Sequence, residues 1–138
     1  MVNGRRDGSG GNGRANGHHK QRMLVVDDNP PIRLLCERIL QERYQVTAVS
    51  SGREALEAIG KEAYDLLLTD LRMPNMDGVE LLNEVSKLDA IPKMMAMTGS
   101  ITDDMQQRLA AVPLSAPILR KPFGAPALLE LISQCLSQ

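Results

Sequence analysis

The sequence predicts an α/β fold in which a five-stranded parallel sheet is doubly wound, with helices covering both of its faces. Two observations support this class. Short apolar runs and amphipathic helical patterns alternate five times along the chain, and such alternation is typical of a parallel sheet packed between helix layers. The chain has 138 residues, 43% of them hydrophobic, which suffices for one compact domain with a buried core.

Five segments are predicted as strands, because each is short, apolar and bounded by polar or turn-forming residues. They are residues 23–26, 44–49, 65–70, 93–98 and 117–121. The fourth is assigned mainly by its position in the alternation, since its methionines have weak strand propensity.

The first and last helices are predicted from the same five-member apolar spacing. Pro30 and Pro31 open the first helix and Pro126 opens the last, because the missing N–H of proline is not needed in a first helical turn. The expected buried stripes are Ile32, Leu35, Cys36, Ile39 and Leu40 in the first helix, and Leu128, Leu131, Ile132, Cys135 and Leu136 in the last.

The three middle helices are predicted mainly from their starts. Ser51 with Glu54, and Asp77 with Glu80, have the spacing of a capping box, in which each side chain bonds the other residue's backbone N–H. The second helix is expected to run to about Gly60. The third has the apolar residues Leu81, Leu82, Val85 and Leu88, and the fourth, over 102–111, has the thin stripe Met105, Leu109 and Val112.

Residues 1–21 are predicted to form a flexible arm, and residues 22–138 the domain. Residues 1–22 contain five Lys or Arg and one Asp, which leaves eleven bases and sixteen acids in the rest. The arm has too few apolar residues to offset its own ordering entropy. Gly8, Gly10 and Gly13 match the G-x-G-x-x-G spacing, but no strand precedes them and no helix follows, so no dinucleotide site is expected. We expect a solubilising tail, with contact to nucleic acid or acidic lipid as the alternative.

Composition argues against several classes of protein. No apolar stretch approaches the roughly 18 residues of a membrane span, and the start of the chain lacks the apolar segment of a signal peptide. We therefore expect a cytoplasmic protein that has no membrane span and no direct contact of its domain with nucleic acid. Cys36 and Cys135 fall on apolar helix faces and are predicted to be buried thiols, not a disulfide or a metal site.

Polar side chains stand where four of the predicted strands end. Asp27 and Asp28 follow the first strand, Asp70 ends the third, Thr98 the fourth and Lys121 the fifth. Parallel strands joined by right-handed crossovers all point the same way, so these five side chains are expected to meet in one crevice at the carboxyl edge of the sheet.

This set of residues indicates a phosphoryl site. Three neighbouring carboxylates repel one another unless a hard divalent cation lies among them, and Mg²⁺ suits carboxylate oxygens and water. A lysine and a threonine hydroxyl can hold phosphoryl oxygens, and Asp70 is the expected nucleophile, since a carboxylate can attack phosphorus. Taken singly, each aspartate could be a helix cap and Lys121 a surface charge; the convergence of all five favours the site.

At these residues the chain resembles the receiver domain of two-component response regulators, in a stand-alone form. The resemblance covers about Arg22 to Leu136 and rests on the stretches LVVDDNPP, LLLTDLRMPNMDG, MAMTGS and LRKPF. It implies a flavodoxin-like sheet with strand order 2-1-3-4-5 and five helices. It also implies that Pro122 forms the lysine-proline step of the family, which is often a cis bond.

The resemblance implies roles for particular residues. Asp28 and Asp70 would bind Mg²⁺ directly, together with the backbone carbonyl of Arg72, while Asp27 assists through water. Asp70 would accept the phosphoryl group from a histidine kinase or a histidine phosphotransfer protein. Thr98 and Lys121 would contact that group and report it to the surface of the fourth helix, fifth strand and fifth helix.

One position departs from the family pattern. Ile118 stands three residues before the lysine, where the family usually has Tyr or Phe, so the usual rotation of an aromatic ring is not expected here. The phosphoryl group would instead be sensed through backbone shifts or helix ordering. Arg72 and Ser100, two residues after Asp70 and Thr98, are expected to tune how fast water removes the group.

The sequence therefore predicts a phosphorylation-dependent signalling switch, not a turnover enzyme, with at most slow Mg²⁺-dependent autophosphorylation and autodephosphorylation. Its output would be the binding of a downstream protein, a second receiver copy or a phosphotransfer protein. Two alternatives remain open. A receiver-like binding module could work without phosphorylation, as Ile118 suggests. A phosphatase of the haloacid dehalogenase type also uses an aspartyl nucleophile, but it needs a second aspartate where this chain has Arg72.

Overall fold

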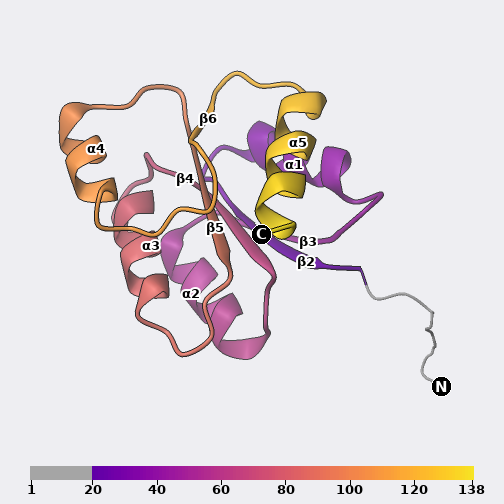
Figure 1. Ribbon diagram of the computed structural model, residues 1–138, viewed down its shortest axis with the longest axis horizontal. Helices are drawn as coiled ribbons and strands as arrows, with labels where there is room; N and C mark the ends of the chain where they lie inside the picture. The colour runs from indigo at the N-terminus through magenta and orange to yellow at the C-terminus, as the bar shows by residue number, and fades with distance from the viewer. Residues whose placement is uncertain (1–19) are drawn as a thin grey trace.

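The computed structural model describes residues 20–138, in which strands and helices alternate strictly (Figure 1). The predictions for the arm at 1–21, including the glycine pattern, fall almost wholly outside this range. The strands are β2 (Arg22–Val26), β3 (Gln45–Val49), β4 (Leu66–Asp70), β5 (Lys93–Thr98) and β6 (Leu119–Arg120). The helices are α1 (Pro30–Leu40), α2 (Gly52–Lys61), α3 (Gly78–Ser86), α4 (Asp103–Leu109) and α5 (Ala125–Leu136).

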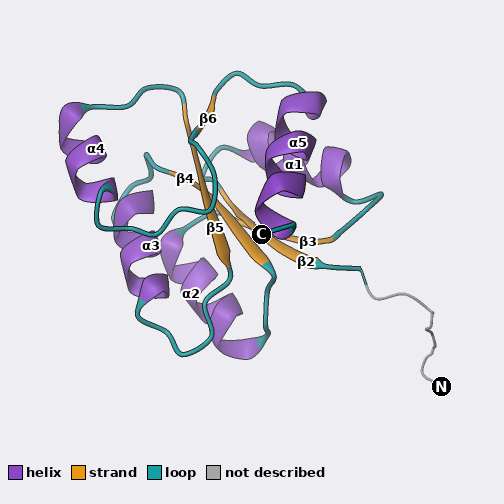
Figure 2. Ribbon diagram, viewed as in Figure 1, coloured by secondary structure: helices purple, strands orange, loops and turns teal. Residues whose placement is uncertain are grey.

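The five strands form one parallel sheet in the order β3-β2-β4-β5-β6. Counted along the described chain this is the order 2-1-3-4-5, so the predicted flavodoxin-like fold is confirmed. The first strand lies inside the sheet, and the chain builds outward from it first to one side and then to the other. Figure 2 shows the strands in the centre with helices on either side.

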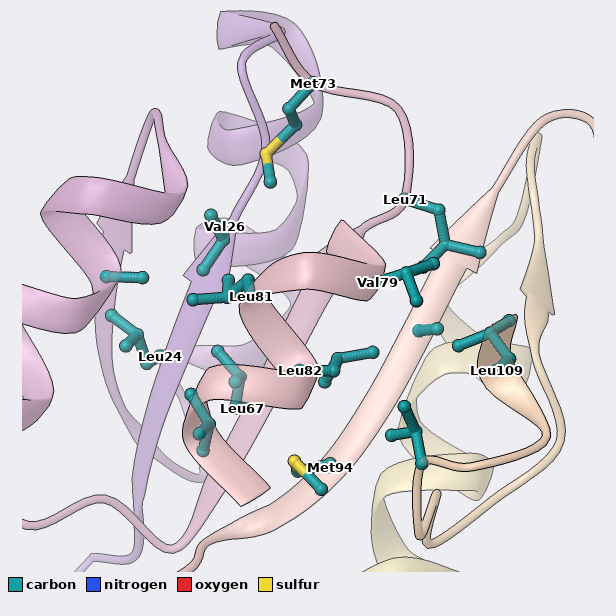
Figure 3. Packing of buried hydrophobic residues seen from close by; sticks show 14 of the residues in the cluster. Leu24, Val26, Leu67, Leu71, Met73, Val79, Leu81, Leu82, Met94 and Leu109 are labelled. Atoms are coloured by element: carbon teal, nitrogen blue, oxygen red, sulfur yellow. The ribbon is translucent and has the colours of Figure 1, made fainter. Parts of the chain in front are cut away.

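Successive strand residues pack against different helix layers, because side chains alternate between the faces of a sheet. Met23 and Val25 face the layer of α1 and α5, whereas Leu24 and Val26 face α2, α3 and α4. Figure 3 shows this second layer, where Leu24, Leu67 and Met94 from three strands meet Leu81 and Leu82 of α3. The three inner strands, β2, β4 and β5, are thus buried on both faces, which explains their continuous apolar runs. The edge strands β3 and β6 are only partly buried.

The helix starts follow the predicted chemistry, with one exception. The side chains of Asp77 and Glu80 form a complete capping box at α3. At α2 the Ser51 hydroxyl accepts from the N–H of Glu54 at 3.1 Å, but the Glu54 carboxylate accepts from the N–H of Ser50 at 2.7 Å and from its hydroxyl at 2.9 Å. The predicted capping box at Ser51 is therefore only half correct, because a second serine competes for the glutamate.

Two predicted helix faces are narrower than expected. Leu35 is 39% exposed, beside Leu34 at 48%, so the buried part of α1 is limited to Cys36 and Leu40. Leu88 lies beyond the end of α3 and is 39% exposed. Leu35 was expected to be buried because the apolar spacing suggests a wider buried arc of α1 than the neighbouring elements cover. Leu88 was misplaced because α3 ends at Ser86, before reaching it.

The last strand and the fourth helix are shorter than predicted. β6 contains two residues, not the five of 117–121. Pro117 has no N–H to donate to a neighbouring strand. The Lys121–Pro122 bond is cis. α4 spans seven residues, with the hydroxyl of Thr102 accepting from the N–H of Met105.

The predictions for the cysteines and for membrane spans have separate outcomes. Cys36 and Cys135 are buried free thiols, as predicted, and both lie in the layer of α1 and α5. Among residues 20–138, no helix has the length and apolar character to cross a membrane.

Candidate functional site

The register of the two central strands brings acidic residues together at the carboxyl edge of the sheet. β2 and β4 are neighbours, and Val26 pairs with Thr69, so Asp27 and Asp70 come next on adjacent strands. This is also the point where the chain changes direction across the sheet, and open α/β sheets form their crevices at such points.

Asp27 is fully buried, and its backbone N–H donates to the carbonyl of Val49 at 3.2 Å. One carboxylate oxygen accepts from the backbone N–H of Asn29 at 2.9 Å, and the other accepts from the ammonium of Lys121 at 2.6 Å. Its backbone carbonyl accepts from the guanidinium of Arg33 at 2.7 Å. These contacts fix the turn that presents the next residue, Asp28.

The carboxylates of Asp27, Asp28 and Asp70 form a compact cluster. One oxygen from each lies within 4.8 Å of the others, with Asp27 and Asp70 buried and Asp28 exposed. Hard oxygen donors at this spacing suit a divalent cation such as Mg²⁺, which keeps several waters, and the exposed side of the cluster leaves room for water. Among residues 20–138 this is the only cluster of three or more potential metal-ligating side chains.

Burial and a neighbouring charge both act on Asp70, which is 5% exposed. Its pKa is raised, first because burial disfavours the carboxylate and second because Asp27 repels it. The ammonium of Lys121 and the backbone N–H of Arg72 act in the opposite direction without cancelling the rise. A carboxyl group in this state gains from a nearby cation.

Lys121 links the two buried carboxylates. Its ammonium lies 2.6 Å from Asp27 and 3.4 Å from Asp70, and its side chain is 17% exposed. Burial alone would lower the pKa of Lys121, but the hydrogen bond to Asp27 and the attraction of Asp70 outweigh burial and raise it. The lysine is therefore a fixed positive charge at the site.

Thr98 is fully buried at the end of β5. Its hydroxyl donates to the carbonyl of Ser100 at 2.8 Å, and the N–H of Ser100 lies 3.3 Å from the same hydroxyl oxygen. The structure thus engages Thr98 with the loop that leads to α4, and the exposed Ser100 belongs to that loop. Of the five residues predicted to converge, the three aspartates and Lys121 lie together in one cluster. The fifth, Thr98, has its hydroxyl bonded to the loop that follows it.

The segment after Asp70 closes tightly onto the strand end. The N–H of Leu71 donates to the carbonyl of Met97, and the N–H of Gly78 donates to the carbonyl of Leu71. A Cβ atom on Gly78 would lie 2.1 Å from the Asp70 carbonyl oxygen, so only glycine allows this approach. Within the segment the Arg72 side chain is exposed, and Asn75 has a φ of 70°.

Ile118 lies just before β6, half-buried against the layer of α2, α3 and α4. It is an aliphatic side chain packed against that layer, at the position where the family usually has an aromatic ring.

Sequence reasoning missed two contributors to the site. Arg33 holds the Asp27 turn from α1, and a base close to a helix start is a signal in itself, because the helix dipole disfavours positive charge there. Gly78 entered the sequence analysis only as the last residue of the stretch LLLTDLRMPNMDG. Its close approach to Asp70 depends on how α3 is placed, which no local pattern shows.

Comparison with known proteins identifies the family. The family described as "Response regulator receiver domain" matches residues 23–133. The chain belongs to this family. It is 35% identical over 117 residues to the response regulator receiver protein CpdR of Brucella abortus, covering 85% of this chain and 97% of that protein.

Solved structures give the same family. The chemotaxis response regulator CheY4 of Vibrio cholerae is 29% identical, with a TM-score of 0.78, over 85% of this chain and 99% of that one. A CheY-like receiver domain protein from Methanospirillum hungatei is 31% identical, with a TM-score of 0.80, over 86% and 94%. This receiver domain also matches the transcriptional regulatory proteins GlrR and QseF of Escherichia coli, of which it spans only 27%.

Proposed function

We propose that this receiver domain is a phosphorylation-dependent switch in which Asp70 accepts a phosphoryl group. One observation carries the proposal: three carboxylates lie within 4.8 Å of one another, and the Lys121 ammonium contacts Asp27 and Asp70 in the same crevice. A crowded acidic site with one fixed cation gains stability when a second cation enters, and it is suited to a metal-assisted phosphoryl transfer.

The donor set fits Mg²⁺. We propose that Asp28 and Asp70 hold the ion directly with the backbone carbonyl of Arg72, and that Asp27 contributes through water. When bound, the ion neutralises phosphoryl oxygens and the carboxylates around them. Both carboxylate oxygens of Asp27 already accept hydrogen bonds, from Asn29 and from Lys121. This agrees with a contact to the ion through water instead of direct coordination.

The phosphoryl donor is proposed to be a phosphohistidine of a kinase or phosphotransfer protein. A carboxylate oxygen of Asp70 attacks phosphorus, the P–N bond to the donor imidazole breaks, and the imidazole nitrogen leaves with the electron pair and takes up a proton. We propose that Lys121 and Thr98 hold the transferred oxygens. We propose no catalytic turnover of a substrate. The domain would only slowly gain and lose its own phosphoryl group, at rates tuned by Arg72 and Ser100.

The phosphorylated form is proposed to bind its output partner through the face of α4, β6 and α5. Phosphorylation adds about two negative charges next to Asp70. The Thr98 hydroxyl, which now donates to Ser100, would turn to the phosphoryl group, and the loop before α4 would follow. Output is then a change in affinity for a downstream protein or a second receiver copy.

The test uses Mg²⁺ with beryllofluoride, which mimics an aspartyl phosphate, and records ¹⁵N-resolved NMR spectra, since the chain has no tryptophan. We expect backbone resonances around Asp70, Thr98 and α4 to shift on addition. In Asp70→Asn the shifts should vanish, whereas Asp89→Asn, an exposed site in the α3–β5 loop, should respond like the wild type. An Asp70→Asn protein that still responds would refute the assignment.

A second candidate is a receiver-shaped binding module that acts without phosphorylation. Ile118 favours it, because an aliphatic side chain packed against α2, α3 and α4 cannot swing as a large ring would. Equal partner affinities for the bare and beryllofluoride-bound forms would select this candidate, and a difference of tenfold or more, about 1.4 kcal/mol, would exclude it.

A further inference from the structure

α4 is the shortest helix among the described residues. It has seven residues, of which only Met105 and Leu109 are buried, and Val112 follows at 7% exposure. Three apolar side chains fix a short helix poorly, because short helices gain their stability mainly from tertiary packing. Polar contacts to neighbouring elements therefore help to fix the position of α4.

One such contact ties α4 to the start of α3. A guanidinium nitrogen of Arg108 lies 3.0 Å and 2.9 Å from the two carboxylate oxygens of Asp77. The side chains are 35% and 25% exposed, and Asp104, one turn earlier on α4, lies 3.7 Å from the other nitrogen. The hydrogen bond to Asp77 raises the pKa of Arg108, so its guanidinium keeps its positive charge.

Asp77 is in turn joined rigidly to the phosphoacceptor segment. Its carboxylate caps α3 by accepting from the N–H of Glu80 at 2.9 Å. The next residue, Gly78, has its N–H on the carbonyl of Leu71 and its Cα against the carbonyl of Asp70. The two backbone segments are in close contact here. A displacement of Asp77 therefore also displaces the backbone of Asp70, which carries the phosphoacceptor carboxylate.

We propose that Arg108 is a positioning residue that couples α4 to Asp70 through Asp77, and that the pair holds α4 in its resting place. This inference rests on the proposed function, since it concerns regulation of the same site. The route bypasses Ile118 and so gives the domain a coupling path that needs no aromatic ring. In the resting form α4 is held at both ends, by the Thr98–Ser100 bond before its start and by Arg108 near its end.

The direction of the effect follows from linkage. The Arg108–Asp77 ion pair stabilises the resting form. A ligand that favours the phosphorylated form must therefore overcome the free energy of this ion pair, and removing the pair strengthens the binding of that ligand. We expect Arg108→Gln and Asp77→Asn each to tighten beryllofluoride binding by about two- to fivefold, the range an incompletely buried ion pair can supply. Asparagine caps a helix as well as aspartate does, so Asp77→Asn removes the charge and keeps the cap.

The experiment titrates beryllofluoride at saturating Mg²⁺ and follows the NMR signals of the wild type, both single variants and the double variant. The double variant should bind no more tightly than either single variant, because both remove one interaction. Arg108→Lys should fall between the wild type and Arg108→Gln, since lysine keeps the charge without the planar fork. Arg43→Gln, an exposed arginine in the loop before β3, is the matched control and should bind like the wild type.

Two further measurements separate coupling from a loss of stability. Mg²⁺ affinity without beryllofluoride should be unchanged in Arg108→Gln, because the three carboxylates are untouched. Amide hydrogens of α4 should exchange faster in the variant. Unchanged or weaker beryllofluoride binding in Arg108→Gln, or additive effects in the double variant, would overturn the inference while the wild-type response keeps the proposed function. A wild type that does not bind beryllofluoride would overturn both.

Discussion

Replacing Asp70 by asparagine should stabilise the bare domain, because the resting site holds more negative charge than its one cation offsets. Asp70 has an oxygen within 4.8 Å of an oxygen on Asp27 and on Asp28. At an effective dielectric constant of about 20, each such pair repels by about 3.5 kcal/mol. The Lys121 ammonium at 3.4 Å attracts by about 5 kcal/mol on the same scale. These pairs leave a net repulsion of about 2 kcal/mol when the exposed Asp28 is screened no more than Asp27. Burial is the first cause of the raised pKa of Asp70 and repulsion by Asp27 the second, and both also favour a neutral asparagine at this position.

Urea unfolding followed by circular dichroism at pH 7, low salt and with EDTA measures this effect. A gain of about 2 kcal/mol would raise the unfolding midpoint by about 1 M urea, since slopes for small domains are about 1–3 kcal/mol per M. Saturating Mg²⁺ should shrink the difference, because the ion stabilises the wild type and loses a ligand in the variant. Asp89→Asn, which removes one exposed charge, controls for net charge.

The pH dependence has a defined sign. A carboxyl group with a raised pKa binds its proton more tightly in the folded state than in the unfolded state. Its contribution to the free energy of unfolding is therefore fully present at low pH. This contribution is lost as the pH rises from the ordinary carboxyl pKa through the raised one. The advantage of Asp70→Asn should therefore be small at acidic pH and grow through that window. Destabilisation by Asp70→Asn at pH 7 without metal would refute the picture of an over-charged site.

Three more predictions follow from particular contacts. Gly78→Ala should lose about 3 kcal/mol or more of stability, because its Cβ would strike the backbone of Asp70 and Leu71. Gly60→Ala is the control: a Cβ there meets nothing within 4 Å, and the variant should gain up to about 1 kcal/mol. Equal effects of the two substitutions in urea unfolding would contradict this contrast. Lys121→Met should cost about 3 kcal/mol by leaving buried carboxylates unpaired, with partial recovery in Mg²⁺; an unchanged unfolding midpoint would speak against the ion pair. Burial raises the pKa of Cys36 from 9.0 to about 11, so in a Cys135→Ser protein a disulfide reagent should label it at least about a hundredfold more slowly when folded than in urea, and rapid labelling of the folded form would contradict its burial.

The sequence was sufficient for the fold because its signals are local and repeated. Proline at the start of α1, capping pairs, and apolar runs with a period suited to strands or helices each fix an element without knowledge of the rest. Asp27 and Asp70 could be placed at one edge from topology alone, since parallel strands carry their last residues to the same side. Conversely, Leu35 was misplaced because exposure depends on how far the sheet extends beneath α1.

Contacts between distant elements could not be predicted. Arg108 and Asp77 are 31 residues apart, and neither has a local pattern that names the other. The sequence also could not show that the Lys121 ammonium lies closer to Asp27, at 2.6 Å, than to Asp70, at 3.4 Å. The same holds for Thr98, whose hydroxyl has found a partner in its own loop.

These resting partners bear on how a phosphoryl group could shift the domain. Lys121 is already bonded to Asp27 and Thr98 to Ser100, so recruiting either group would exchange one hydrogen bond for another instead of adding one, and such exchanges are worth about 1 kcal/mol each. Small differences keep both forms accessible, as a reversible switch requires, because an equilibrium shifted by more than about 5 kcal/mol responds to no second signal of ordinary strength. Had Lys121 or Thr98 lacked a resting partner, the phosphorylated form would gain about 1–3 kcal/mol more for each such group, which is larger than the contribution expected from a partly exposed contact such as the Arg108–Asp77 pair.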